Sequence, residues 1–164
     1  MAWVGSTVTA QVLGLLSMPQ GLNACVTTLA QALNTTAAPL AQSQLAAQNV
    51  AIDLAEHSQD VTYPAVSVYC DKIVNQLKEK FRAFSGIAVM TIEVRVSQDR
   101  LEGIEGQSQM YLDALTQVLD QNRGDWGEGM FYAGGYEAVF GQVKHGGRNF
   151  IQVAKVTFNV GVSN

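Results

Sequence analysis

The chain has 164 residues and a mass of 17.6 kDa, which is enough to bury one self-sufficient hydrophobic core. Its net charge of −4 argues against a dedicated nucleic-acid binding protein, because such proteins show a basic excess. No run of 18 apolar residues is present, so the sequence predicts no transmembrane helix and no membrane partner. We expect a single domain over residues 1–164, with an uncharged helical N-terminal region (1–60) and a sheet-plus-helix core (61–164).

The N-terminal region has two apolar stripes at helical spacing, one from Val8 to Leu16 and one from Leu22 to Leu33. Turn-forming residues 17–21 separate them, which predicts a helical hairpin. Residues 37–48 fit either a short helix or an ordered loop, and residues 49–54 fit a short strand. The first 71 residues contain no Lys or Arg. Such a segment suits either core packing or an interface with other copies or a partner, and the sequence leaves both readings open.

Two strands are expected next in the chain. Residues 65–70 alternate in hydropathy and follow Pro64, a residue that is allowed at the first position of a strand. Residues 87–97 show the clearest alternation, which predicts one buried face and one solvent-exposed face. The residues on the expected exposed face are polar: Thr91, Glu93, Arg95 and Ser97.

The segment between these strands, residues 72–84, fits either a helix or a long charged hairpin arm, and helix propensity favours the helix. A further helix is expected over residues 102–119, with Gly124 as its C-terminal stop. The patterns over residues 130–140 and 149–162 then predict two long strands.

Residues 144–148 would form the loop between those last two strands, and Gly134 and Gly135 would mark a bulge or a close backbone approach within the first of them. Helices, strands, a helix and more strands in this order are typical of an α+β domain. We therefore expect a mixed or antiparallel β-sheet with one long helix packed on it, plus the N-terminal helical hairpin.

The sequence offers little for catalysis or cofactor binding. It has neither a phosphate-binding loop nor the Gly-x-Ser-x-Gly motif of a hydrolase nucleophile. Cys25 and Cys70 are interpreted as buried thiols, and His57 and His145 lack partners at metal-ligand spacing. We predict no catalytic residue, no metal site and no cofactor. A small hydrolase using Cys70 or a carboxylate pair is the weakest alternative.

Several short segments carry a family resemblance. Tyr63-Pro64-Ala65-Val66-Ser67-Val68-Tyr69 and Thr91-Ile92-Glu93-Val94-Arg95-Val96 resemble two consecutive strands of the tail-terminator (tail-completion) proteins of long-tailed bacteriophages, of the lambda type. The helix expected over 102–119 and the final pair of strands follow in the order found in that family. The resemblance covers residues 60–164, whereas the longer N-terminal region departs from the family.

The resemblance implies a structural virion protein without enzymatic activity. Such proteins form a six-membered ring at the head-proximal end of the tail tube, where they stop tube polymerisation and offer a face for head attachment. The implied partners are other copies of the chain, the tail-tube protein and the head-side connector or stopper protein. DNA would pass through the lumen without sequence-specific binding. The protein would be assembled in the host bacterial cytoplasm and located in the tail or neck of the virion.

Within that picture, the exposed loops over residues 72–84, 122–129 and 141–149 should carry the interfaces. Arg and Trp are the residue types that most often contribute interface energy. The candidate interface residues are Arg123, Trp126, Lys144, Arg148, Phe81 and Tyr136. Two further readings of the same assembly stay open: a head-completion or stopper protein, and a tail-tube protein.

Overall fold

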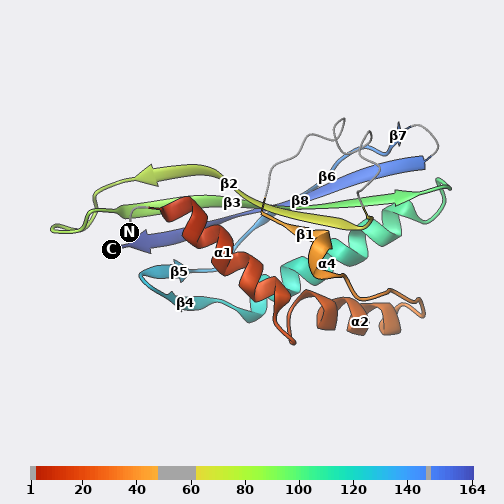
Figure 1. Ribbon diagram of the computed structural model, residues 1–164, viewed down its shortest axis with the longest axis horizontal. Helices are drawn as coiled ribbons and strands as arrows, with labels where there is room; N and C mark the ends of the chain where they lie inside the picture. The colour runs from red at the N-terminus through yellow and green to blue at the C-terminus, as the bar shows by residue number, and fades with distance from the viewer. Residues whose placement is uncertain (1–2, 48–61, 147–148) are drawn as a thin grey trace.

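The computed structural model describes residues 3–47, 62–146 and 149–164 (Figure 1). The 49–54 strand expectation and His57 lie outside these residues. The elements are α1 (Val4–Ser17), α2 (Leu22–Ala32), the 3-10 turn η1 (Gln42–Gln44), β1 (Leu45–Ala46), β2 (Ala65–Asn75), β3 (Ser85–Gln98), α4 (Ile104–Gln121), β4 (Gly124–Gly127), β5 (Met130–Tyr132), β6 (Glu137–Phe140), β7 (Lys144–Gly146) and β8 (Asn149–Ser163).

The strands form one mixed sheet in the order β1-β2-β3-β8-β5-β4, with β6 and β7 also paired to β8. The parallel pair is β1 with β2, and the remaining pairs are antiparallel. The two central strands, β3 and β8, pair along their whole length, from Ser85 opposite Ser163 to Gln98 opposite Phe150. The α+β class and the mixed sheet are therefore confirmed.

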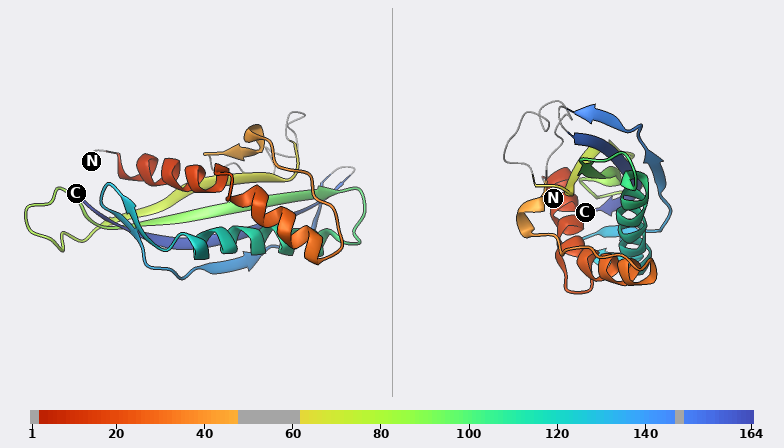
Figure 2. Two further views of the ribbon diagram at one scale, coloured as in Figure 1. Left: turned by 90° about the horizontal axis from the view of Figure 1, so that it is seen from below. Right: turned by 90° about the vertical axis from the view of Figure 1, so that its right-hand side faces the viewer.

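The helices lie on one side of this curled sheet (Figure 2). The helix α1 packs mainly on β2, whereas α4 packs on β3 and β8. The apolar side chains of the helices and strands form one buried cluster, in which Val8, Ile92 and Leu115 have no exposed surface. Burial of this shared face holds the two layers together.

The two N-terminal helices form as expected, but they do not fold back on each other as a hairpin. Their axes are bent by 43° at the break after Ser17. The reason is that α2 buries Cys25, Val26 and Ala30 and makes its main contacts with α4 rather than with α1. Within the described residues, no single helix is long and apolar enough to cross a membrane, whereas the bent pair passes that length and composition test.

The prediction of a helix over residues 72–84 is wrong, and the structure has the alternative hairpin arm. The strand β2 continues to Asn75 and pairs with β3 on both sides of a register shift between Cys70 and Lys72. The side chain of Asn75 closes the loop at its base: its Oδ1 accepts hydrogen bonds from the backbone N–H groups of Leu77 (3.2 Å) and Ser85 (3.1 Å). Its Nδ2 donates to the carbonyl of Ala83 at 3.3 Å. Strand pairing and this asparagine outweigh helix propensity.

The expected exposed face of β3 is largely buried. Thr91, Glu93 and Arg95 are at most 4% exposed. Arg95 forms an ion pair with Glu93, and this pairing offsets part of the cost of removing the two charges from water. The alternation of side chains was correctly predicted, but the solvent exposure of the polar face was not.

The C-terminal third is more divided than expected. The single strand expected over 130–140 is broken into β5 and β6, since Gly134 and Gly135 adopt φ of 98° and 86° between them. The strand expected over 149–162 is confirmed as β8. The segment expected as a loop from residue 144 instead contributes β7, which pairs with the start of β8. Gly124, expected to end the helix, is instead the first residue of β4, because α4 ends at Gln121.

Candidate interaction surface

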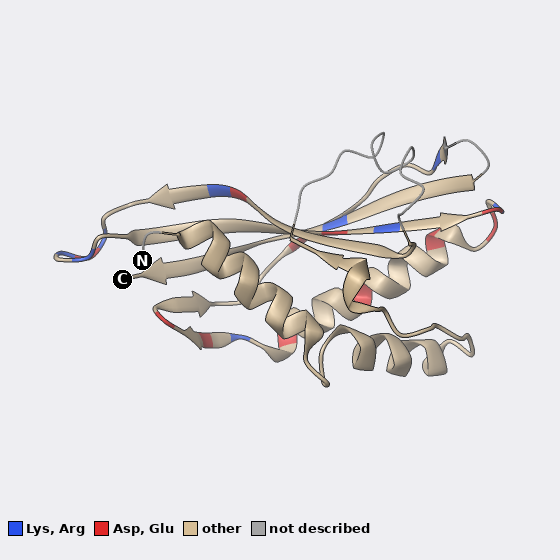
Figure 3. Cartoon of the chain, viewed as in Figure 1, with Lys and Arg blue, Asp and Glu red and all other residues tan. Residues whose placement is uncertain are grey.

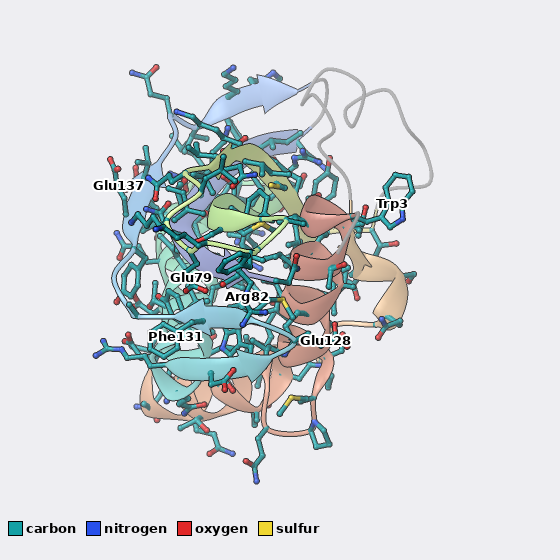
Figure 4. The ribbon with its side chains drawn as sticks, turned by 90° about the vertical axis from the view of Figure 1, so that its left-hand side faces the viewer. Trp3, Glu79, Arg82, Glu128, Phe131 and Glu137 are labelled. Carbon is teal, nitrogen blue, oxygen red and sulfur yellow. The ribbon has the colours of Figure 1, made fainter. Side chains whose placement is uncertain are left out.

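Large exposed apolar side chains gather at two places on the sheet. One group lies along the β2–β3 hairpin, and the other lies on β5, β6 and the segment between them. Figure 4 labels Phe131 of the second group. The hairpin group consists of Ile73, Leu77 and Phe81, and the second group consists of Phe131, Tyr136, Val139 and Phe140. Exposed apolar side chains of this size on a projecting hairpin and on an open edge strand make both places candidates for association.

The loop at the end of the hairpin, residues 76–84, is called the hairpin tip below. Phe81 projects entirely into solvent (103% exposed), and Leu77 is 65% exposed. Both residues have positive φ, 68° and 48°, in the left-handed region that costs a non-glycine residue about 1 kcal/mol or more. The surrounding hydrogen bonds must offset that cost.

Contacts with the end of β8 fix the hairpin tip. The Ser163 hydroxyl donates to Glu79 Oε2 at 2.7 Å, and the same carboxylate lies 3.5 Å from Arg82 Nε. Backbone N–H groups of Phe84 and Asn164 donate to each other's carbonyls at 3.1 and 2.9 Å. The tip is therefore held as an ordered projection with its apolar side chains turned outward, an arrangement suited to insertion into a partner.

The edge strand β6 is the centre of the second group. All four of its residues, Glu137–Phe140, are exposed. It pairs with β8 on one side, and among the described residues no strand pairs with its other side. An open edge presents unpaired N–H and C=O groups that can extend a sheet into another chain. Glu137 is charged, but the other three residues of β6 are apolar, so most of that edge lacks the charges that commonly protect an edge strand.

The candidate interface residues do not form one cluster. Phe81 lies at the hairpin tip, whereas Lys144 is exposed on β7, toward the other end of the molecule (Figure 1). Tyr136 is exposed between β5 and β6. Arg123 is exposed and pairs with Asp120 at 2.9 Å. Arg148 lies outside the described residues.

The remaining candidate, Trp126, has a structural position. Its ring is half-buried against the core and lies 5.5 Å from the ring of Tyr132. Its Nε1–H donates to the Asn122 carbonyl at 2.6 Å, next to the end of α4. These contacts use both the apolar surface and the polar group of the indole, as is usual for a packed tryptophan.

A buried polar cluster on the second face of the sheet was not expected from the sequence. Glu93 is its centre: Oε2 lies 2.7 Å from Arg95, and Oε1 accepts from Tyr69 at 2.8 Å and lies 3.1 Å from Lys155. Next to it, Thr91 donates to Asp71 at 2.5 Å. The available signal was the Glu-x-Arg spacing, since residues two apart on a strand share a face.

The electrostatics of this cluster favour structure over acid–base chemistry. Burial alone would raise the pKa of Glu93, but hydrogen bonds from Lys155 and Tyr69 and the charge of Arg95 lower it overall. Burial and the neighbouring Glu93 carboxylate raise the pKa of Tyr69 above its usual range. Both shifts move titration away from neutral pH, so Glu93 stays ionised and Tyr69 stays neutral there.

Cys70, the thiol of the hydrolase alternative, lies far from His145, which could otherwise act as its base. Cys70 on β2 pairs with Met90 on β3, and Met90 pairs with Phe158 on β8. His145 on β7 pairs with Phe150 on β8. Eight residues of β8 separate these positions, which is about 26 Å along a strand. Burial also raises the pKa of Cys70. Among the described residues, no group of three His, Cys, Asp or Glu side chains is placed to hold a metal ion.

A cavity of about 680 Å³ lies at the C-terminal end of α2, the loop that follows it and the first turns of α4. Its wall is made of uncharged residues, including Leu33, Leu40, Met110 and Tyr111. Gln98 and Gln107 are hydrogen-bonded to each other at its rim. This size is typical of a pocket that accepts a small apolar group. The sequence did not point to it, because it is formed by segments distant along the chain.

The chain matches no known protein-family model, and no curated protein is significantly similar to it.

Proposed function

We propose that this chain is a structural virion protein that forms a ring at the head-proximal end of a phage tail tube, stops tube polymerisation and provides the head-attachment face. The single observation that carries the proposal is the outward-facing apolar surface of the β2–β3 hairpin and β6. A chain that presents apolar residues on an ordered projection and on an open sheet edge is built for association with other protein chains.

The order of elements supports the family resemblance. The strand that follows Pro64, the strand containing Glu93 and Arg95, the 18-residue helix α4 and the last strand β8 follow in the expected order, whereas the first strand of the expected final pair is divided into β5 and β6. The paired central strands with α4 beneath them form a sheet-plus-helix core, and this arrangement supports the proposal.

The proposed mechanism is geometric and needs no cofactor. One face of the ring would match the last ring of tail-tube protein, and the other face would fit the head-side connector or stopper protein and be unable to template more tube. The chain has only ten Lys and Arg residues against fourteen Asp and Glu residues. Few basic residues suit a lumen through which DNA slides, because each contact with a phosphate adds affinity and slows movement.

The test is the assembly state of the purified full-length chain, measured by light scattering after size exclusion and by negative-stain imaging of the same peak. The proposal predicts a closed ring, six-membered as in the family. Phe140→Lys on β6 should lower the assembled fraction, whereas Asp113→Asn at an exposed position of α4 should leave it unchanged. Unlimited tubes would favour a tail-tube protein instead. A wild-type chain that stays monomeric at all concentrations would contradict the proposed self-association.

A further inference from the structure

We propose that neighbouring copies of this chain join head to tail, with the hairpin tip of one copy seated in the 680 Å³ cavity of the next. The inference rests on the proposed function, because it assumes a ring of identical subunits. It names one contact that would hold that ring together. It does not depend on what the ring caps.

The tip supplies the apolar group. The ring of Phe81 is not buried against its own subunit, because the side chain is fully exposed. Leu77 lies on the same loop and is also exposed. The loop is ordered before binding by Asn75 at its base and by Ser163 on Glu79. Preorganisation lowers the entropy cost of inserting the two side chains into a partner.

The cavity supplies a matching wall. Its apolar lining includes Leu33, Ala38, Pro39, Leu40, Met110 and Tyr111. A dry cavity of about 150 Å³ already accepts a benzene ring, so the volume available here is sufficient for Phe81 together with Leu77. The wall carries no charged side chain that would lose hydration when covered.

The charges around the two partners are of opposite sign (Figure 3). The tip carries Lys78, Lys80 and Arg82 against Glu79, and Lys78 and Lys80 are exposed. The loop before α4 and its first turn carry Asp99, Glu102 and Glu105 against Arg100, all of them exposed. The partial positive charge of the α4 N-terminus is about half a unit and is smaller than the two carboxylates beside it. Complementary charge therefore favours this pairing and its orientation.

Only another copy can supply the tip. The hairpin tip lies at one end of the long axis of the molecule, and the first turns of α4 and the loop after α2 lie toward the other (Figure 1). A subunit cannot reach its own cavity. A contact between two different surfaces repeats from copy to copy until the rotation closes a ring, or it continues as a filament.

Site-directed cross-linking tests the contact directly. A Phe81→Cys variant is mixed with a Gly106→Cys variant, since Gly106 lines the cavity and a Cβ placed there meets nothing within 4 Å. After mild oxidation, the proposal predicts a disulfide-linked heterodimer whose linked peptides contain positions 81 and 106. Replacing Phe81→Cys by Val139→Cys, another exposed apolar position, should abolish that product.

A filled cavity gives a second readout that does not require cysteine chemistry. Gly106→Leu should raise the dissociation constant for self-association at least tenfold. Gly14→Leu is its matched control: Gly14 also lies within a helix with open space beside it, so both substitutions gain the same helix propensity. Glu102→Lys with Glu105→Lys should also weaken association, and a Lys78→Glu, Lys80→Glu partner should restore it.

The outcomes separate this contact from the proposed ring. The 81–106 cross-link together with weakening by Gly106→Leu supports the inference. If the wild-type chain forms a ring, but the two cysteine variants give no such cross-link and Gly106→Leu does not weaken association, the ring stands and this contact is overturned. A chain that is monomeric throughout and forms no cross-link overturns both.

Discussion

The Glu93–Arg95 pair gives the sharpest prediction about stability. Glu93→Gln keeps the shape of the side chain and an oxygen acceptor, but it removes the charge. The two side chains are only 6% and 4% exposed and lie 2.7 Å apart, so the loss occurs in a poorly hydrated site. Removing one partner of such a buried pair costs about 3 kcal/mol or more. Lys155, which is half exposed, also lies 3.1 Å from the Glu93 carboxylate, and solvent weakens that second ion pair.

For a chain of this length, about 3 kcal/mol corresponds to a fall in melting temperature of roughly 6–12 °C. The loss should also depend on pH. The pKa of Glu93 is lowered in the folded state, so its charge stabilises the protein fully above the unfolded pKa of about 4.3 and less as the pH falls through the folded pKa. Wild type and Glu93→Gln should therefore differ most at neutral pH and converge below about pH 4.3.

Urea unfolding followed by circular dichroism at several pH values measures both effects. Glu137→Gln is the matched control, because Glu137 is exposed on β6 and its substitution should change stability by less than about 0.5 kcal/mol. A loss below about 1 kcal/mol for Glu93→Gln at pH 7, or a loss that is unchanged at pH 3, would refute the reasoning.

Two further substitutions test the core and the hairpin. Leu115→Ala should cost about 2–5 kcal/mol, because the side chain is fully buried beneath the sheet, whereas Leu101→Ala at an exposed position should cost less than about 0.5 kcal/mol. Gly86→Ala should destabilise by about 2 kcal/mol or more, since the added Cβ would lie 1.8 Å from a backbone carbonyl oxygen of the paired strand. Chemical denaturation measures all three, and a Gly86→Ala variant as stable as wild type would show that β2 and β3 do not approach so closely.

Periodicity alone was sufficient for the long central elements. The alternation over residues 87–97 and 149–162 gave β3 and β8 to within two residues, and the stripe over 102–119 gave α4 within two residues. These segments are long and are buried against each other, so their pattern records their packing.

The hairpin arm shows why the same method failed elsewhere. Ile73, Leu77, Phe81 and Phe84 recur at helical spacing, and a pattern of that kind is normally the buried side of a helix. Three of the four are exposed here and only Phe84 is buried. Apolar residues that face outward carry no signal of their own in a single sequence, so the spacing favours a helix over the hairpin arm that the structure has.

The candidate site was predicted less completely than the fold. Phe81 and Tyr136 were chosen by residue type and are exposed, and their role in an interface stays a prediction. Trp126 is a candidate by the same argument, but its indole ring packs against Tyr132 and its N–H donates to the Asn122 carbonyl. Which aromatic residue faces solvent depends on tertiary packing, which residue type does not encode.

The most direct test of the account is the molar mass of the wild-type chain across a concentration series, with images of the same samples. The proposed terminator ring predicts that the mass rises to a plateau at six copies and that the particles are single rings with a central hole. A mass that increases without limit, or one that stays at 17.6 kDa throughout, would contradict the central claim.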